Sequence, residues 1–265
     1  MRSPTGPLVI AHRGASGDAP ENTLPAVAEA IRVGADMVEV DVRLSGDGQA
    51  VIFHDETIGR TTRVPARPAR RLGPKTRLSE LTLQEIRRLD AGGWFDRRFA
   101  RTRVPTLDEV VSACAGRIGL NLELKPDRRS TGPSRARLVA ALSPIISSHP
   151  EPNALLFSSF DHESLAELRR LHPGVRIGLL LTRDQVVGRG RLIESFKTAS
   201  ALSAVSVNLP SAAVTPSLVE TVHRRGYAIY VYTVNAPAAL RRLIAAGVDG
   251  IFTDRPARLR LLVPR

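Results

Sequence analysis

Short apolar runs recur along this chain, and in several of them polar residues alternate with apolar ones. Because successive side chains of a strand point to opposite faces, a period of two predicts a strand. Eight runs are candidate strands, at residues 8–11, 36–42, 118–124, 154–158, 176–181, 204–209, 228–234 and 250–253. In the second half of the chain they alternate with helix-like stretches, at residues 162–171, 190–199, 216–225 and 236–246. Strand–helix alternation predicts βαβ units and a parallel sheet.

Residues at the ends of these stretches support the predicted helices. Asp161 is a candidate N-cap for the first of them, and Thr215 precedes Pro216 in the order typical of a helix start. Gly247 follows the last helix as a predicted C-terminal stop.

The number of candidate strands predicts the fold class. Eight parallel strands with intervening helices are typical of an α/β TIM (β/α)8 barrel. An open doubly wound sheet is the alternative, but no glycine-rich phosphate loop follows a strand into a helix. We therefore expect one TIM-barrel domain over residues 1–265, with a small insertion subdomain at about 55–106, after the second strand.

One apolar run, residues 50–53, does not fit the alternation. It follows the second strand after Ser45-Gly46-Asp47-Gly48-Gln49, a connection too short for a parallel crossover and rich in turn residues. We therefore predict that it pairs antiparallel with the end of the second strand and brings His54 alongside Asp41.

The insertion that follows has one predicted helix and a basic loop. Leu81, Ile86 and Leu89 have helical spacing, which predicts a helix at 82–89. Residues 57–79 contain no acid and seven cations, which are Arg60, Arg63, Arg67, Arg70, Arg71, Lys75 and Arg77. Such a loop could steer anionic substrates toward a site, or it could be a solvated loop without a role.

Composition narrows the class of partner. The net charge of +12 is typical of nucleic-acid-binding proteins. However, the basic residues are scattered over helices and aromatic residues make up only 4% of the chain, which argues against nucleic-acid binding. We expect a small-molecule substrate, no nucleic acid and no stable membrane insertion, and the oligomeric state stays open. The single Cys114, the lack of an apolar run of membrane-spanning length and the lack of a signal-like segment after Met1 favour a cytoplasmic protein.

Carboxylates lie within two of the predicted strands. Glu39 and Asp41 share one strand face, and Glu123 lies on the polar face of another strand. Acids that point inward from buried strands need a cation or partner. Together with nearby histidines and cationic residues, they predict a hard divalent metal above an anionic substrate.

Polar residues also gather at the carboxyl ends of the strands, where TIM barrels place their chemistry. These residues are His12, Arg13, Asp41, Lys125, Ser159, Asn208, Asn235 and Asp254. Each residue alone is weak evidence for a functional site. We expect Asp254 to close the barrel by pairing with an arginine. Together they could supply metal ligands, proton carriers and anion binders.

Several motifs resemble the glycerophosphodiester phosphodiesterase family, in order along nearly the whole chain. The motifs are His12-Arg13-Gly14, Glu21-Asn22-Thr23, Glu39-Val40-Asp41, His54-Asp55, Glu123-Leu124-Lys125, Ser159-Phe160, Tyr232-Thr233-Val234-Asn235 and Gly250-Ile251-Phe252-Thr253-Asp254. The resemblance implies a TIM barrel with an insertion subdomain, and hydrolysis of glycerophosphodiesters to an alcohol and glycerol 3-phosphate.

The resemblance also implies roles for residues. Glu39, Asp41 and Glu123 would hold Ca²⁺ or Mg²⁺, with His12 and His54 as general acid and base. Arg13 and Lys125 would contact phosphate, and Phe160 and Tyr232 would lie against the substrate. The chain departs from the family at Tyr232, where tryptophan is frequent, and in its basic loop.

Several alternatives stay open from the sequence. One is a phospholipase-D-like or inositol phospholipase-like lipid phosphodiesterase, and another is a noncatalytic phosphate-binding protein. Water or a hydroxyl of the substrate could be the nucleophile.

Overall fold

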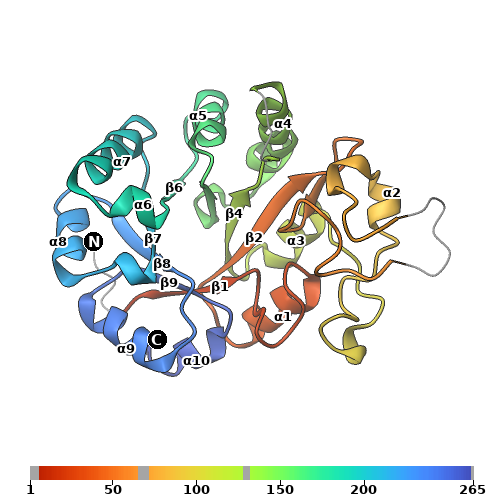
Figure 1. Cartoon of the computed structure of the whole chain (residues 1–265), viewed down its shortest axis with the longest axis horizontal. Helices are drawn as coiled ribbons and strands as arrows, with labels where there is room; N and C mark the ends of the chain where they lie inside the picture. Colours follow the sequence, from red (N-terminus) through yellow and green to blue (C-terminus); the bar gives the residue numbers. More distant parts are fainter. Residues whose placement is uncertain (1–5, 65–71, 128–131, 264–265) are drawn as a thin grey trace.

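Eight parallel strands form a closed TIM barrel in a computed structural model that describes residues 6–64, 72–127 and 132–263 (Figure 1). The strands are β1 (Leu8–His12), β2 (Met37–Leu44), β4 (Gly119–Leu124), β5 (Leu155–Ser159), β6 (Ile177–Leu180), β7 (Ser206–Pro210), β8 (Ala228–Tyr232) and β9 (Gly250–Thr253). Neighbours pair in the order β1-β9-β8-β7-β6-β5-β4-β2, and β1 also pairs with β2, which closes the ring. The predicted fold class is confirmed.

Helices surround the barrel and cover the outer faces of its strands (Figure 1). They are α1 (Leu24–Arg32), α3 (Leu107–Cys114), α4 (Gly132–Ser148), α5 (His162–Leu171), α6 (Arg183–Val186), α7 (Arg189–Ala201), α8 (Pro216–His223), α9 (Pro237–Ala246) and α10 (Pro256–Arg260). Among the described residues, no helix is both long and apolar enough to cross a bilayer.

The three predicted capping residues are confirmed. The side chain of Asp161 accepts a hydrogen bond from the Ser164 amide at the start of α5, and Thr215 accepts one from the Leu218 amide at the start of α8. Gly247 ends α9 with a left-handed φ of 78°, which glycine adopts without steric cost.

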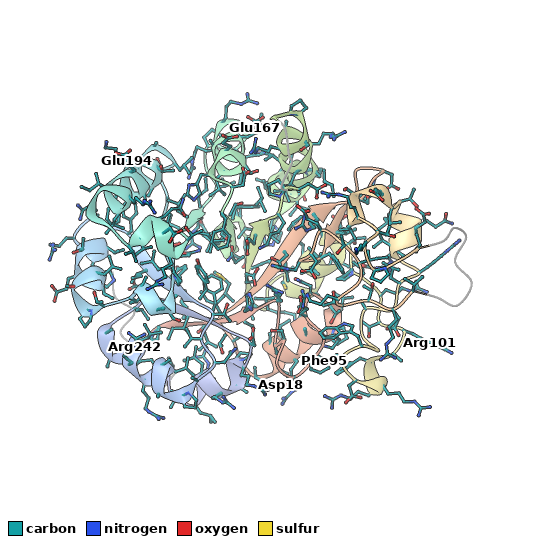
Figure 2. All side chains as sticks on the ribbon, in the orientation of Figure 1. Asp18, Phe95, Arg101, Glu167, Glu194 and Arg242 are labelled. Carbon is teal, nitrogen blue, oxygen red and sulfur yellow. The ribbon has the colours of Figure 1, made fainter. Side chains whose placement is uncertain are left out.

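The hydrophobic core has layers inside and outside the barrel. A small cluster fills the interior, made of Ile10, Met37, Leu156, Tyr230 and Phe252. Two larger clusters lie between strands and helices. Figure 2 shows side chains crowding the middle of the ring, whereas labelled charged residues such as Glu167 and Glu194 lie on the outer helices. The barrel is therefore a packed scaffold, with space for chemistry at its mouth.

A short strand, β3 (Ala50–Ile52), pairs antiparallel with the end of β2, as predicted. Val42 lies opposite Ile52, and the Phe53 amide donates to the Asp41 carbonyl at 2.9 Å. This hairpin places His54 next to the Phe53–Asp41 hydrogen bond and close enough to Asp41 for the two side chains to interact electrostatically.

The segment after β3 packs around its own apolar cluster, which includes Phe53, Ile58, Leu78 and Leu89. The predicted helix at 82–89 is wrong at its C-terminal end, because α2 spans only Leu83–Ile86. Asp90 exchanges two backbone hydrogen bonds with Arg63, and this pairing turns the chain away from the helical path while Leu89 stays buried. Two 3₁₀ turns, η1 (Leu78–Glu80) and η2 (Arg97–Phe99), flank α2.

Part of the predicted basic loop, with Arg67, Arg70 and Arg71, lies outside the described residues. Two of its other arginines contact carboxylates. Arg60 contacts Glu21 and Asp55, and Arg77 lies 3.3 Å from Glu56.

Candidate active site

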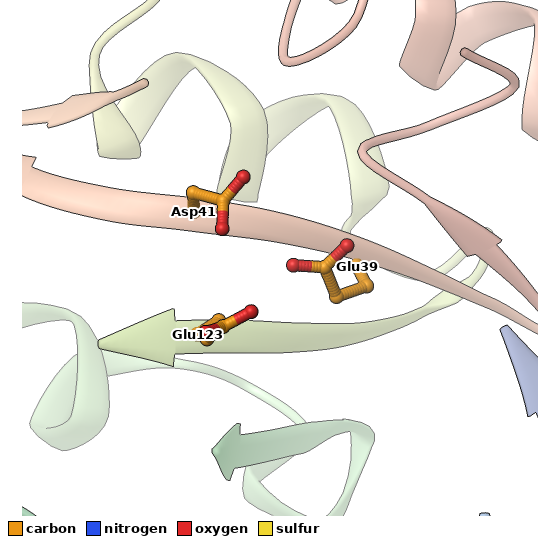
Figure 3. Close-up of side chains that lie close together, drawn as sticks. All are labelled: Glu39, Asp41 and Glu123. Atoms are coloured by element: carbon orange, nitrogen blue, oxygen red, sulfur yellow. The ribbon is translucent and has the colours of Figure 1, made fainter. Parts of the chain in front are cut away.

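Three buried carboxylates converge at the mouth of the barrel. Glu39 and Asp41 extend from β2, and Glu123 extends from the neighbouring β4, where it is in register with Asp41 (Figure 3). One oxygen from each residue lies within 4.8 Å of the others. Parallel pairing of two adjacent strands therefore brings together the acids that the sequence separates by more than eighty positions.

The carboxylate cluster fits a divalent metal ion. One oxygen of each acid, Glu39 Oε1, Asp41 Oδ1 and Glu123 Oε1, is buried, and within the described part of the chain neither Glu39 Oε1 nor Asp41 Oδ1 accepts a hydrogen bond. Lys125 Nζ is close to two of these oxygens, at 3.4 Å from Asp41 and 2.6 Å from Glu123. Buried polar atoms nearly always have a partner, and a hard cation would satisfy one oxygen from each acid.

The pKa values of the three acids diverge because their surroundings differ. Burial, together with the charges of Asp41 and Glu123, raises the pKa of Glu39 well above its ordinary value. Burial also raises the pKa of Glu123 to about 7, although Lys125 opposes this shift. Asp41 is equally buried, but Lys125 and Arg13 outweigh its burial and lower its pKa below the usual range. Without a cation, the cluster does not hold three negative charges comfortably near neutral pH.

Arg13 reaches this cluster through an unusual backbone conformation. Its φ of 55° lies in the left-handed region, which costs a non-glycine residue energy and is concentrated at functional sites. The Arg13 amide donates to Glu39 Oε2 at 2.8 Å, and its guanidinium lies 2.7 Å from Glu21 and 3.4 Å from Asp41. The next residue must be glycine, because a Cβ atom at position 14 would come within 2.7 Å of Ala26.

Asn22 holds Asp41 on its other side. The Asn22 side chain donates to Asp41 Oδ2 at 2.7 Å and accepts from the Asp41 amide at 3.1 Å. Its own backbone is also left-handed, with a φ of 57°, a conformation that asparagine tolerates better than most residues. Asp41 is thereby fixed between Asn22, Arg13 and Lys125.

Asp254 contacts His12, which corrects the expectation that it pairs with an arginine to close the barrel. Its Oδ1 lies 2.7 Å from His12 Nδ1, and its Oδ2 accepts from Asn235 at 2.5 Å. These hydrogen bonds outweigh the burial of Asp254 and lower its pKa to about 2. Asp254 is therefore an anion that can orient the His12 ring and stabilise its protonated form.

His54 has the same arrangement with its sequence neighbour. Its Nδ1 lies 2.6 Å from Asp55 Oδ1. Hydrogen bonds from His54 and Arg60 outweigh the partial burial of Asp55 and lower its pKa. Each histidine thus has an anionic carboxylate on its Nδ1 side.

A cavity of about 180 Å³ joins eight of the nine predicted site residues. Its lining includes His12, Arg13, Glu39, His54, Glu123, Lys125, Phe160 and Tyr232. Asp41, the ninth, is buried behind it in the carboxylate cluster. The Phe160 and Tyr232 rings meet edge to face at 5.7 Å between centroids, and Phe160 is 41% exposed.

Not every polar residue at a strand end belongs to this cavity. Ser159 is fully buried, where it donates to the Leu124 carbonyl and accepts from the Asp161 amide. Asn208 is also buried, beside Ser206 within β7. These two residues support neighbouring strands rather than the cavity.

The sequence did not place four residues that hold the site together among the predicted site residues. Asn22, Glu21, Asp55 and Arg60 each contact a predicted site residue or its partner. Glu21, Asn22 and Asp55 belong to the motifs that resemble the family, and this was the only sign in the sequence that they matter to the site. Their contacts depend on loop conformations, which the periodicity of a sequence does not predict.

Comparisons with known proteins show which family this chain resembles. The model of the glycerophosphoryl diester phosphodiesterase family matches residues 12–258. A glycerophosphodiester phosphodiesterase of Caldanaerobacter subterraneus is 36% identical over 257 residues, which cover 97% of each protein.

Solved structures agree in fold as well as in sequence. A crystal structure of a glycerophosphoryl diester phosphodiesterase from Silicibacter pomeroyi, itself described as putative, is 32% identical, with a TM-score of 0.88 over 98% of this chain and 94% of that one. An Oleispira antarctica phosphodiesterase in complex with the product sn-glycerol-3-phosphate is 31% identical, with a TM-score of 0.83 over 97% and 96%. The chain therefore belongs to the glycerophosphoryl diester phosphodiesterase family.

Proposed function

We propose that this protein hydrolyses glycerophosphodiesters to an alcohol and glycerol 3-phosphate in a metal-dependent reaction. One observation carries the proposal. A single cavity is lined by two histidines, each beside its own carboxylate, and by acids of a buried three-carboxylate cluster with Arg13 and Lys125 around it. Such a cavity supplies proton carriers and positive charge to an anionic phosphodiester.

The two histidines are the proposed general acid and base. With Asp254 and Asp55 on the Nδ1 sides, the Nε2 atoms of His12 and His54 are left for proton transfer. One histidine takes a proton from the attacking hydroxyl, and the other donates a proton to the leaving alkoxide. The attacking hydroxyl belongs either to water or to the substrate.

Arg13 and Lys125 are the proposed phosphate-binding residues. Burial opposes their charge, but the surrounding acids outweigh it and raise the pKa of both side chains. They therefore stay cationic and can stabilise charge that grows on the phosphoryl oxygens.

Phe160 and Tyr232 are the proposed wall against the glycerol side of the substrate. The Tyr232 hydroxyl donates to the Leu181 carbonyl at 2.6 Å. Tyr232 therefore offers its ring rather than its hydroxyl to a ligand.

Glu39, Asp41 and Glu123 are the proposed ligands of the metal, which we expect to be Ca²⁺ or Mg²⁺. When bound there, the ion would supply positive charge for the nonbridging oxygens and lower the pKa of the attacking hydroxyl. Assays of the chelated protein with each metal added back would determine the preference between the two ions.

Metal affinity is expected to rise with pH between about pH 6 and 8. The metal binds ionised carboxylates, whereas the pKa of Glu123 is raised to about 7 in the metal-free site. Below that pH, each displaced proton should weaken the apparent affinity about tenfold per pH unit. Calorimetric titration in buffers of different ionisation enthalpy measures the released protons. An affinity independent of pH across this range would contradict the expectation.

A substrate screen tests the proposed function. Purified protein with Ca²⁺ or Mg²⁺ is expected to release glycerol 3-phosphate from several glycerophospho-alcohols, detected by a coupled dehydrogenase assay. Activity confined to long-chain phospholipids would favour the lipid phosphodiesterase alternative. Binding without turnover of any phosphodiester would favour the noncatalytic alternative.

We also propose that residues 1–265 act as one catalytic domain in the cytoplasm. The insertion at about 55–106 supplies Asp55, which contacts His54 of the cavity, and Arg60, which contacts Asp55. The only cysteine, Cys114, is buried and free, which suits a reducing compartment. Fractionation of source cells tests the location.

A further inference from the structure

Arg60, the first cation of the basic loop, binds two carboxylates at once. Its Nε and Nη2 donate to Asp55 at 2.6 and 3.1 Å. Its Nη1 and Nη2 donate to Glu21 at 2.8 and 2.7 Å. Asp55 follows β3, whereas Glu21 precedes α1. One guanidinium therefore ties the insertion to the loop after β1.

Each of these carboxylates has its second contact with a proposed site residue. Asp55 lies against His54 Nδ1 at 2.6 Å. Glu21 accepts from Arg13 at 2.7 Å, through the same oxygen that receives Arg60 Nη2. The contacts run in one line from His54 through Asp55, Arg60 and Glu21 to Arg13.

The other histidine provides an internal comparison. Asp254, the carboxylate beside His12, accepts from the neutral side chains of Asn235 and Ser16. Asp55 instead has a charged guanidinium from the insertion, and the Arg60 side chain is 47% exposed. The orientation of His54 thus depends on a loop residue, whereas that of His12 depends on groups near the barrel ends.

We infer that Arg60 is a positioning residue for the proposed reaction, because it fixes Asp55 behind His54 and Glu21 behind Arg13 together. Arginine suits this role because its planar fork presents donors in a fixed geometry to both carboxylates. A lysine carries the same charge, but it cannot make four such bonds. This inference rests on the proposed function. For Arg60, positioning takes the place of the steering of anionic substrates that the sequence suggested for the basic loop.

Substitution of Arg60 separates positioning from charge. Arg60→Ala and Arg60→Lys are both expected to lower kcat about tenfold or more, a part of the 10²–10⁴ that a general acid or base contributes. Lys75→Ala removes one exposed charge from the same loop and is expected to leave kcat unchanged. If steering were the role, Arg60→Lys would keep wild-type kcat/KM and the loss in Arg60→Ala would vanish at high salt, which would overturn the inference.

A double-mutant cycle locates the effect. In the Asp55→Asn background, Arg60→Ala is expected to lower kcat by a smaller factor than in the wild-type protein, because only its contacts with Glu21 are left to lose. Independent, multiplicative losses would contradict positioning through Asp55. Circular dichroism and thermal melting of each variant identify any that fail to fold, and for those Arg60→Gln replaces Arg60→Ala.

A readout without turnover keeps this test separate from the proposed function. The His54 Nδ1 proton, assigned by its loss in His54→Ala, is expected as a downfield proton resonance. It should broaden or disappear in Arg60→Ala and Arg60→Lys, and persist in Lys75→Ala. If it is unchanged in the Arg60 variants, the inference fails even if the protein hydrolyses glycerophosphodiesters. If it is lost while no substrate is turned over, the proposed function fails and the positioning stands.

Discussion

Exhaustive chelation is expected to abolish turnover, and Glu123→Gln is expected to lower kcat by at least about 10²-fold at saturating metal. The reason is the buried cluster of Glu39, Asp41 and Glu123, in which Glu39 Oε1 and Asp41 Oδ1 accept no hydrogen bond from the described residues. Removing one charge and one ligand should also weaken metal affinity. Titration of the apo protein with Ca²⁺ and Mg²⁺, together with steady-state assays, measures both effects.

Stability provides a check that the loss is not unfolding. The environment of Glu123 disfavours its charged form, with a pKa raised to about 7. Glutamine is therefore not expected to destabilise the metal-free protein at pH 8, where the wild-type residue is ionised. Glu220→Gln, on the exposed face of α8, is the matched control and should keep full activity. Undiminished turnover after complete chelation would refute the metal-dependent mechanism.

Replacement of either histidine is the second prediction with a large effect. His12→Ala and His54→Ala are each expected to lower kcat by about 10²- to 10⁴-fold, with smaller changes in KM. Both rings line the same cavity, and each lies beside an anionic carboxylate at 2.6–2.7 Å. Removal of one ring leaves either the nucleophile or the leaving group without its proton carrier.

A control and a substrate series complete this test. His172→Ala is expected to keep normal kcat, because His172 follows the C-terminal end of α5 and contacts Ser143. A substrate with an acidic leaving group should restore turnover only in the variant that lacks the general acid. This comparison assigns the two roles. Near-wild-type kcat in either variant would show that the assignment is wrong.

Local pattern was sufficient for the fold and for the histidines and charged residues that line the cavity, whereas Phe160 and Tyr232 were implied only by the family resemblance. Alternation of period two and the intervening helices predicted eight parallel strands, because strand faces and helix faces repeat at fixed local intervals. The five residues between β2 and β3 were too few for a crossover, so the antiparallel hairpin and the place of His54 followed from chain length. Inward alternation alone grouped Glu39 with Asp41.

The partners of these residues were decided by tertiary structure. Asp254 lies against His12 because barrel closure pairs β1 with β9 across 242 positions of sequence. The early end of α2 follows from the pairing of Arg63 with Asp90. Neither contact has a periodic signature.

The conformations of the loops around the site were also decided by tertiary structure and not by local sequence pattern. Arg13 and Asn22 reach the carboxylates through left-handed backbone conformations, which non-glycine residues adopt only where surrounding contacts outweigh the local cost. Arg60 meets Glu21 across 39 positions, although by sequence it belongs to a uniformly basic loop. The sequence by itself thus determined the strands, the hairpin and the set of chemical groups. Their mutual orientation depends on barrel closure and loop packing, which are long-range and cooperative and leave no local pattern.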